Sequence, residues 1–225
     1  MVSPQVAVTA AHCVFDNMDG LNPTYNGSPI YVNLTNKVQG GPTFRTRIKE
    51  IRQNSCYPLA YADNEIPTAA ASDLALLILE DPKPDAELGV DYIEIWDDEV
   101  DGDLTGREFA LMGWGRSGDV NNPDSGLWDF HRGYNVVETY QTNRIAYNFD
   151  DPALEGLPLE GQCNNGDSGG SATIEQDGTR KLIGACSWGY TREGYRDPAW
   201  GLFDEYTSVS GWQRSWIMAN IASPD

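Results

Sequence analysis

The chain has 225 residues, and its 34 acidic against 15 basic side chains give a formal net charge of −19. Hydrophobic residues make up 40% of it, which supports a packed core of one large β domain or two smaller ones and excludes wholesale disorder. The acidic excess excludes nucleic acid and anionic membranes as partners, because both are bound through basic surfaces. No apolar run of about 18 residues predicts a membrane-spanning helix.

Short apolar runs separated by Gly, Pro, Asn and Asp predict an all-β barrel or sandwich along most of the chain. In chain order, the predicted strands are Val6–Thr9, Pro29–Leu34, Thr43–Ile51, Leu74–Leu79, Glu108–Gly113, Ser171–Ile174, Lys181–Trp188 and Trp200–Phe203. The polar, proline-containing stretch from Asp81 to about Thr105 predicts a connection between two halves, and Asp119–Ser125 predicts a further loop.

Only the C-terminal end of the chain predicts a helix. Ser210 is a suitable N-cap residue, and Trp212, Trp216, Ile217 and Ile221 follow at helical spacing. We expect these four apolar side chains to form one packing face.

Three short segments carry candidate catalytic residues. His12 follows a strand and three small residues in Thr9–Cys13, Asp73 opens the apolar run Asp73–Leu79, and Ser168 lies inside the glycine-rich Gly166–Gly170. Serine becomes a nucleophile when a base within hydrogen-bond reach takes its proton, and neutral imidazole suits that task near pH 7. An acid on the other ring nitrogen holds the imidazole and stabilises the imidazolium that forms. The three segments together therefore predict acyl-transfer chemistry.

Five blocks in this order resemble the trypsin-like serine peptidase family: the His12 and Asp73 segments, Met112–Gly115, the Ser168 segment, and Cys186–Gly189. The chain order of histidine, aspartate and serine agrees with that family and differs from subtilisins and α/β-hydrolases. The resemblance implies two six-stranded Greek-key β-barrels and a C-terminal α-helix. It divides the chain into residues 1–105 and 106–225, which together form one peptidase domain.

The same resemblance implies a serine endopeptidase that acts on protein or peptide substrates and accepts protein inhibitors. It implies a secreted monomer, made as a zymogen, that uses no cofactor. His131, the second histidine of the chain, lies in no motif and is interpreted as structural. The implied site comprises the base His12, the orienting acid Asp73, the nucleophile Ser168, oxyanion N–H groups of Gly166 and Ser168, and substrate-binding Gly161, Gln162, Ser187, Trp188 and Gly189.

The approach to the serine indicates which side chains the enzyme accepts. Cys163 stands one residue further from Ser168 than the family's usual cysteine, so the pocket floor is Gly161 or Gln162 on the two simplest registers. Neither is acidic, which argues against strict Arg or Lys specificity and favours a small or apolar substrate side chain. Glu160 would restore a cationic preference only if the loop slid by another residue.

Four cysteines allow three full pairings, and the sequence alone does not choose among them. From the resemblance, a bridge between Cys13 and Cys56 is expected, with a longer spacing than the family's usual one. A bridge between Cys163 and Cys186 would be atypical, because the family's usual partner position after Gly189 holds no cysteine.

Asp167 is the acid that, in this family, pairs with an α-amino group freed by propeptide cleavage. Only eleven residues precede His12, too few for the family's first strand, so the first barrel is expected to be incomplete at its N-terminal side. An unpaired buried carboxylate is costly. We therefore expect either that the sequence belongs to a longer, secreted precursor or that another group pairs with Asp167. The alternative function is a non-catalytic fragment that keeps the fold for binding.

The acidic segment Asp97–Glu108 resembles a twelve-residue calcium loop, with acids at positions one, three, five and twelve and Gly at position six. Its flanks do not predict helices, and such matches arise easily in an acidic chain. A solvated loop between the barrels is the favoured interpretation, and no metal site is expected.

Overall fold

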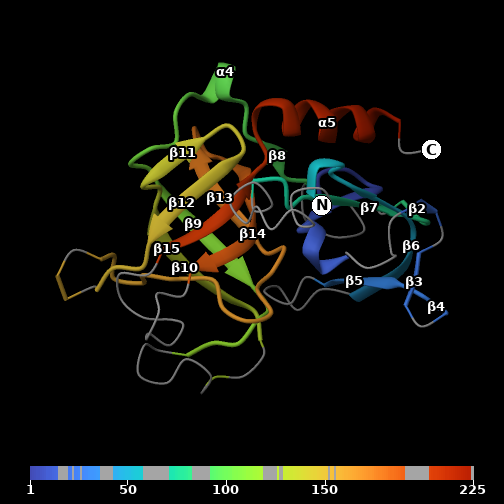
Figure 1. Ribbon diagram of the computed structural model, residues 1–225, viewed down its shortest axis with the longest axis horizontal. Coiled ribbons are helices and arrows are strands. Elements are labelled where there is room, and N and C mark those ends of the chain that lie inside the picture. Colours follow the sequence, from blue (N-terminus) through green and yellow to red (C-terminus); the bar gives the residue numbers. More distant parts are fainter. Residues whose placement is uncertain are drawn as a thin grey trace.

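The structure is a computed structural model of the chain, and it describes residues 1–14, 20–21, 23–25, 27–35, 43–57, 71–82, 92–118, 126, 129–151, 153–154, 156–190 and 203–223. Within these residues the fold is mostly β, with two large sheets side by side and a helix at the C-terminal end (Figure 1). The predicted all-β class with a terminal helix is confirmed. The described sheets hold five and eight strands, where six per barrel were expected.

The first sheet contains β7, a strand between β1 and β6 that is covered on both faces. Its order is β1-β7-β6-β2, and β5 also pairs with β6. The central apolar run of β7 is buried except at Leu77, which is half-buried, and this explains its lack of alternation. The strands are β1 (Val6–Thr9), β2 (Gly20–Leu21), β5 (Tyr31–Thr35), β6 (Thr43–Gln53) and β7 (Ala75–Leu79).

The second sheet runs in the order β10-β9-β13-β14-β15-β12-β11, with antiparallel neighbours throughout, and β8 pairs in parallel with β14. Its core holds Phe109, whose ring meets those of Tyr147 and Tyr206 edge-on at 5.3 and 6.0 Å. The strands are β8 (Glu94–Ile95), β9 (Glu108–Gly113), β10 (His131–Val136), β11 (Thr139–Gln141), β12 (Arg144–Asn148), β13 (Ser171–Gln176), β14 (Thr179–Tyr190) and β15 (Phe203–Ser208).

The C-terminal helix α5 (Gly211–Ala222) joins the two halves of the core, since Ile217 packs in one cluster with Val6 of β1 and Leu182 of β14. The predicted burial of Trp212 in its packing face is wrong, because Trp212 is 46% exposed. Gln213 is buried instead, and its side-chain amide donates to the Ala71 carbonyl at 2.8 Å.

Ser210 precedes α5 but does not cap it with its side chain. Its hydroxyl donates instead to the carbonyl of Thr142 at 2.9 Å, which ties the start of the helix to the β11–β12 turn. The remaining short elements are η1 (Ala11–Cys13), the hairpin β3 (Thr24–Tyr25) with β4 (Ser28–Pro29), and α4 (Asp98–Asp101).

Most predicted strands are confirmed, with β1 and β9 at the predicted bounds. Of the predicted strand Trp200–Phe203 only Phe203 is described, where β15 begins, and the predicted loop 119–125 lies outside the described residues. Strands β10 and β12 were not predicted.

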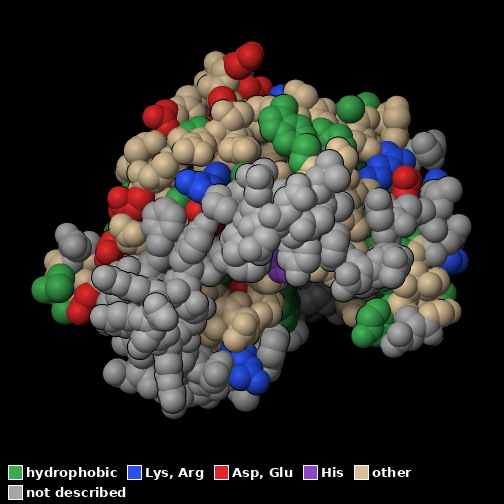
Figure 2. All heavy atoms as spheres, in the orientation of Figure 1, with side chains coloured by type: hydrophobic (Ala, Val, Ile, Leu, Met, Phe, Trp, Pro, Cys, Tyr) green, Lys and Arg blue, Asp and Glu red, His purple; other side chains and the backbone are tan. Residues whose placement is uncertain are grey.

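The acidic segment that resembles a calcium loop is engaged with neighbouring side chains. Asp98 accepts the hydroxyl of Tyr140, and Asp101 pairs with Lys181 at 2.5 Å. In the part of the chain that the structure describes, no three His, Cys, Asp or Glu side chains group as a metal site. Figure 2 shows acidic side chains over α4 and along the side of the second sheet. Among the described helices, none is long and apolar enough to span a membrane.

Candidate active site

His12 lies in η1, the 3₁₀ turn that follows β1, and it meets Asp73 at two points. Its ring Nδ1 is 2.5 Å from Asp73 Oδ2, and its backbone N–H donates to Asp73 Oδ1 at 2.7 Å. Strands β1 and β7 are antiparallel neighbours, with Thr9 opposite Ala75. The end of one strand and the start of the other are thus adjacent, which brings together two residues that are 61 positions apart in the sequence.

Asp73 is almost fully buried, at 1% exposure, and a third donor reaches it from the second sheet. The hydroxyl of Ser187 in β14 donates to Asp73 Oδ2 at 2.7 Å. Buried carboxylates require such partners, and here His12 and Ser187 supply them from opposite halves of the chain. Ser187 was predicted from the resemblance as a substrate-strand residue, and its contact with Asp73 was not foreseen.

The proton affinity of His12 depends on this pairing. Burial of the imidazole acts to lower its pKa, but the hydrogen bond to Asp73, with a smaller contribution from one to Cys13, raises the pKa of His12 to about 10. The ring is therefore mostly an imidazolium at neutral pH. Proton abstraction requires the minor, neutral form.

Ser168 is exposed in a turn whose glycines allow a close approach to β1. Gly166 and Gly169 have φ of 92° and 75°, in the left-handed region that favours glycine. A Cβ atom on Gly169 would lie 2.3 Å from Thr9 Oγ1 and 3.0 Å from the backbone nitrogen of Ala10. The serine turn thus abuts the residues that lead into His12. Among the described residues, no hydrogen bond joins Ser168 to His12.

The N–H groups predicted to bind an oxyanion belong to this turn. Its other amides are engaged: Asp167 N donates to Asn164 O, Gly169 N to Cys186 O, and Gly170 N to Asp167 O. For the N–H groups of Gly166 and Ser168, the described part of the chain provides no acceptor. This leaves both donors available to a ligand.

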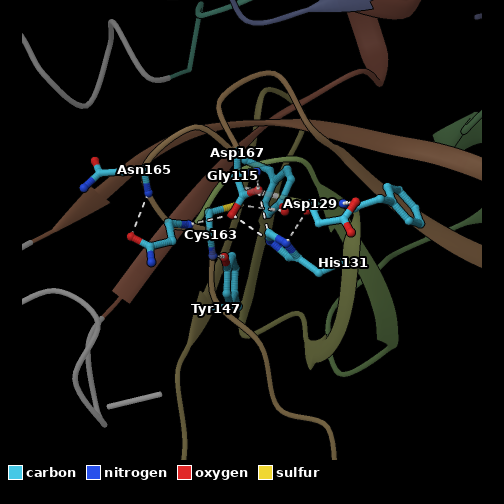
Figure 3. A network of polar contacts seen from close by, with 10 residues as sticks. Gly115, Asp129, His131, Tyr147, Cys163, Asn165 and Asp167 are labelled. Carbon is cyan, nitrogen blue, oxygen red and sulfur yellow. Dashed lines mark hydrogen bonds and ion pairs between the residues drawn. The ribbon is translucent and has the colours of Figure 1, made fainter. Parts of the chain in front are cut away.

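Asp167, between those two donors, is 4% exposed and has a side-chain partner that the sequence did not reveal. His131 Nε2, at the start of β10, lies 3.2 Å from its carboxylate. Figure 3 shows the His131 ring directed at Asp167, with Asp129 on its other side. The only signals available were that a buried acid needs a partner and that the chain has just two histidines.

The predicted pocket-floor residues, Gly161 and Gln162, precede the serine turn in the chain and lie beside β10. Gly161 exchanges backbone hydrogen bonds with this strand, its N–H donating to Tyr134 O at 2.9 Å. Both Gly161 and Gln162 line a cavity of about 210 Å³ that also receives His131. The carboxylate of Glu160 accepts the backbone N–H groups of Asp150 and Leu157, within its own loop.

Trp188 and Gly189, the remaining predicted substrate residues, continue β14 and pair in register with Glu205 and Asp204 of β15. All four cysteines are free thiols, and Cys13 and Cys56 are exposed. A hydrogen bond from Cys163, together with burial, raises the pKa of the Cys186 thiol. The two cysteines of the atypical bridge are thus neighbours without a disulfide.

A comparison with curated proteins found no match. The family model described as Trypsin matches residues 1–212, which include His12, Asp73 and Ser168 and all five sequence blocks. The match covers both sheets and ends two residues into the terminal helix. On this evidence the chain belongs to the trypsin family of serine peptidases.

Proposed function

We propose that this protein is a serine endopeptidase in which Ser168 is the nucleophile, His12 the general base and Asp73 the acid that orients it. The observation that carries the proposal is the buried carboxylate of Asp73, which binds the His12 ring at 2.5 Å and the Ser187 hydroxyl at 2.7 Å. This arrangement fixes Nδ1 toward Asp73, so that Nε2 is the nitrogen left to take a proton from serine.

The proposed reaction proceeds in two acyl transfers. Ser168 Oγ bonds to the scissile carbonyl carbon as its proton moves to His12, and the oxyanion that forms accepts the N–H groups of Gly166 and Ser168. The carbon–nitrogen bond then breaks, and the imidazolium gives its proton to the leaving amine. Water repeats the sequence on the acyl-serine: its proton passes to His12 and returns to Ser168 Oγ as the acid product leaves.

We further propose that the two halves, residues 1–105 and 106–225, form one catalytic unit, since His12 and Asp73 come from the first and Ser168 and Ser187 from the second. The candidate floor residues Gly161 and Gln162 carry no charge, which favours small or apolar substrate side chains over Arg or Lys. Secretion as a monomer and action without a cofactor follow from the family resemblance.

Covalent labelling tests this proposal directly. A fluorophosphonate probe should modify the folded chain, and mass spectrometry should place the adduct on Ser168. We expect Ser168→Ala to lose labelling and to lower peptide hydrolysis by about 10⁴- to 10⁶-fold at unchanged thermal stability. A chain that folds, carries Ser168 and neither labels nor hydrolyses any peptide would instead favour the non-catalytic alternative.

A further inference from the structure

We infer that His131 is a positioning residue: as an imidazolium, it holds the carboxylate of Asp167 and thereby fixes the turn that carries the oxyanion donors and Ser168. The inference rests on the proposed function, because it assigns His131 a part in the same reaction. The protonation state of the His131 ring can also be tested without an activity measurement.

The two neighbours of the His131 ring require a doubly protonated form. Nδ1 lies 3.0 Å from the carbonyl oxygen of Asp129, which can only accept a hydrogen bond, so Nδ1 must donate. Nε2 lies 3.2 Å from the Asp167 carboxylate. Each oxygen of that carboxylate already accepts a backbone N–H, so neither is placed to act as an O–H donor. Nε2 therefore donates as well, and the ring is cationic.

The carboxylate of Asp167 connects three separate segments. Oδ1 accepts the N–H of Gly115, just beyond β9, at 2.7 Å, and Oδ2 accepts the N–H of Asn164, ahead of the serine turn, at 2.9 Å. His131 adds β10 as the third segment. Because Asp167 lies between Gly166 and Ser168 in the chain, its position determines where their N–H groups point.

Close packing leaves Asp167 little freedom to choose another position. A Cβ atom on Gly113 would lie 1.9 Å from Asp167 Oδ1, and one on Gly115 would lie 2.7 Å from it. Only glycines at the end of β9 leave room for the carboxylate. A charge buried to 4% exposure is costly, and a partner of opposite sign lowers that cost beyond what the two backbone N–H groups provide.

His131 is the cation at ion-pair distance from Asp167 within the described residues. Other charged groups line the same cavity. The guanidinium of Arg132 stacks over the Tyr134 ring at 5.0 Å, and Arg116 anchors the turn through its backbone N–H to Asn165 O at 3.0 Å. The Glu160 carboxylate is held by backbone N–H groups of its own loop, and burial raises the pKa of this group. Loss of the His131 proton would leave Asp167 without its paired charge.

Substitution of His131 should weaken the chemical step more than substrate binding. Loss of one oxyanion donor lowers kcat by about 10²- to 10³-fold in a serine peptidase, and a loosened donor turn should approach this range. We expect His131→Ala to lower kcat and the rate of fluorophosphonate labelling at least about tenfold, with a smaller change in KM. His131→Lys keeps a cation and should restore part of the loss.

Chemical rescue separates a charge effect from a packing effect. Imidazole or methylammonium added to His131→Ala should enter the cavity of about 210 Å³ and restore activity. The matched control is Arg180→Ala, which removes an exposed cation of β14 that pairs with Glu175 outside this cavity and should leave all these quantities unchanged.

Nitrogen-15 NMR of the two histidine rings provides a readout that does not need an active enzyme. At neutral pH the His131 signals, assigned with His131→Ala, should show a proton on both ring nitrogens in the unchanged chain and on only one of them in Asp167→Asn. A His131 ring with a single proton in the unchanged chain would overturn the inference. Labelling of Ser168 at the same rate in His131→Ala would also overturn it and would leave the proposed function intact. If the unchanged chain never labels while both ring nitrogens carry a proton, the proposed function fails and the charge pairing stands.

Discussion

At the scale of single residues, the histidine of the site carries an unusual proton affinity. Asp73 holds a short hydrogen bond to His12 from an almost fully buried position, and the Cys13 side chain adds a second contact. With the pKa of His12 raised to about 10, the neutral base is the minor form at pH 7. The rate of acylation should therefore increase with pH until His12 has lost its proton.

The first prediction concerns this pH dependence. The acid limb of the kcat/KM profile should lie well above pH 6.5, the ordinary value for histidine. Cys13→Ala removes the thiol contact that helps to raise the His12 pKa, so the limb should move to lower pH and kcat/KM at neutral pH should rise several-fold. The measurement is kcat/KM for one peptide across the pH range.

Cys56→Ala is the control for this prediction, because it removes the other exposed thiol of the described chain without touching His12. It should leave the limb in place. An acid limb near pH 6.5 in the unchanged chain would contradict the raised proton affinity. An upward movement in Cys13→Ala would contradict the assigned direction of the thiol's effect.

At the scale of secondary-structure elements, an irregularity in β14 directs Ser187 to the site. The pairing of β14 with β15 shifts register between Cys186 and Trp188, so Ser187 has no partner in the ladder. Such a bulge re-aims a side chain, and here the hydroxyl points out of the sheet toward Asp73 of the first half. The bulge is thus one of the features that join the two halves at the site.

The second prediction tests the contribution of that hydroxyl. Ser187→Ala removes a hydrogen bond to a buried carboxylate, and bonds to charged groups contribute about 1.5–3 kcal/mol. We expect a loss of this size in the free energy of unfolding, measured with denaturant. Ser215→Ala, on the exposed side of α5 with only a 3.4 Å contact to Gly211 O, should change it by less than about 0.5 kcal/mol. Equal stability of the two variants would contradict the role given to the bulge.

The same elements show how far sequence reasoning reached. The apolar run of β7 and the alternation of β9 were sufficient to predict both strands. Strand β10 was missed because two of its inward positions are Gly133 and Asn135, which give no apolar signal although they are buried. Asn135 is accommodated there by donating its amide to two carbonyls. The missed strand is also the one that carries His131.

The candidate site could be predicted from the sequence only in its motif-bearing part. The segments around His12, Asp73 and Ser168 are distinctive in residue type and order, and these were the basis of the prediction. The partners Ser187 and His131 reach Asp73 and Asp167 through a bulge and an unpredicted strand, and neither is visible in local sequence. Trp212 shows that a local pattern can also mislead. Its helical spacing predicted burial, but the buried residue at the start of α5 is Gln213.

At the scale of the whole molecule, the excess of negative charge destabilises the compact folded state through electrostatic repulsion. The 34 acids exceed the 15 bases by 34 − 15 = 19. Described pairs such as Arg52 with Glu50 at 2.7 Å and Lys181 with Asp101 at 2.5 Å neutralise a part of this charge locally. The remaining acids repel one another over distances that mobile ions can screen.

The last prediction is that salt stabilises this protein. Raising NaCl from roughly 0.01 M to roughly 0.15 M shortens the screening length from about 30 Å to about 8 Å. We expect the melting temperature to rise by a few degrees, since about 1 kcal/mol corresponds to roughly 2–4 °C in a chain of this size. A fall would mean that attractive pairs such as Lys181 with Asp101 outweigh the repulsion. Tetramethylammonium chloride should give the same rise if screening is the cause. A larger rise with calcium chloride at equal ionic strength would instead identify specific binding, for which the acidic segment Asp97–Glu108 is the first place to substitute.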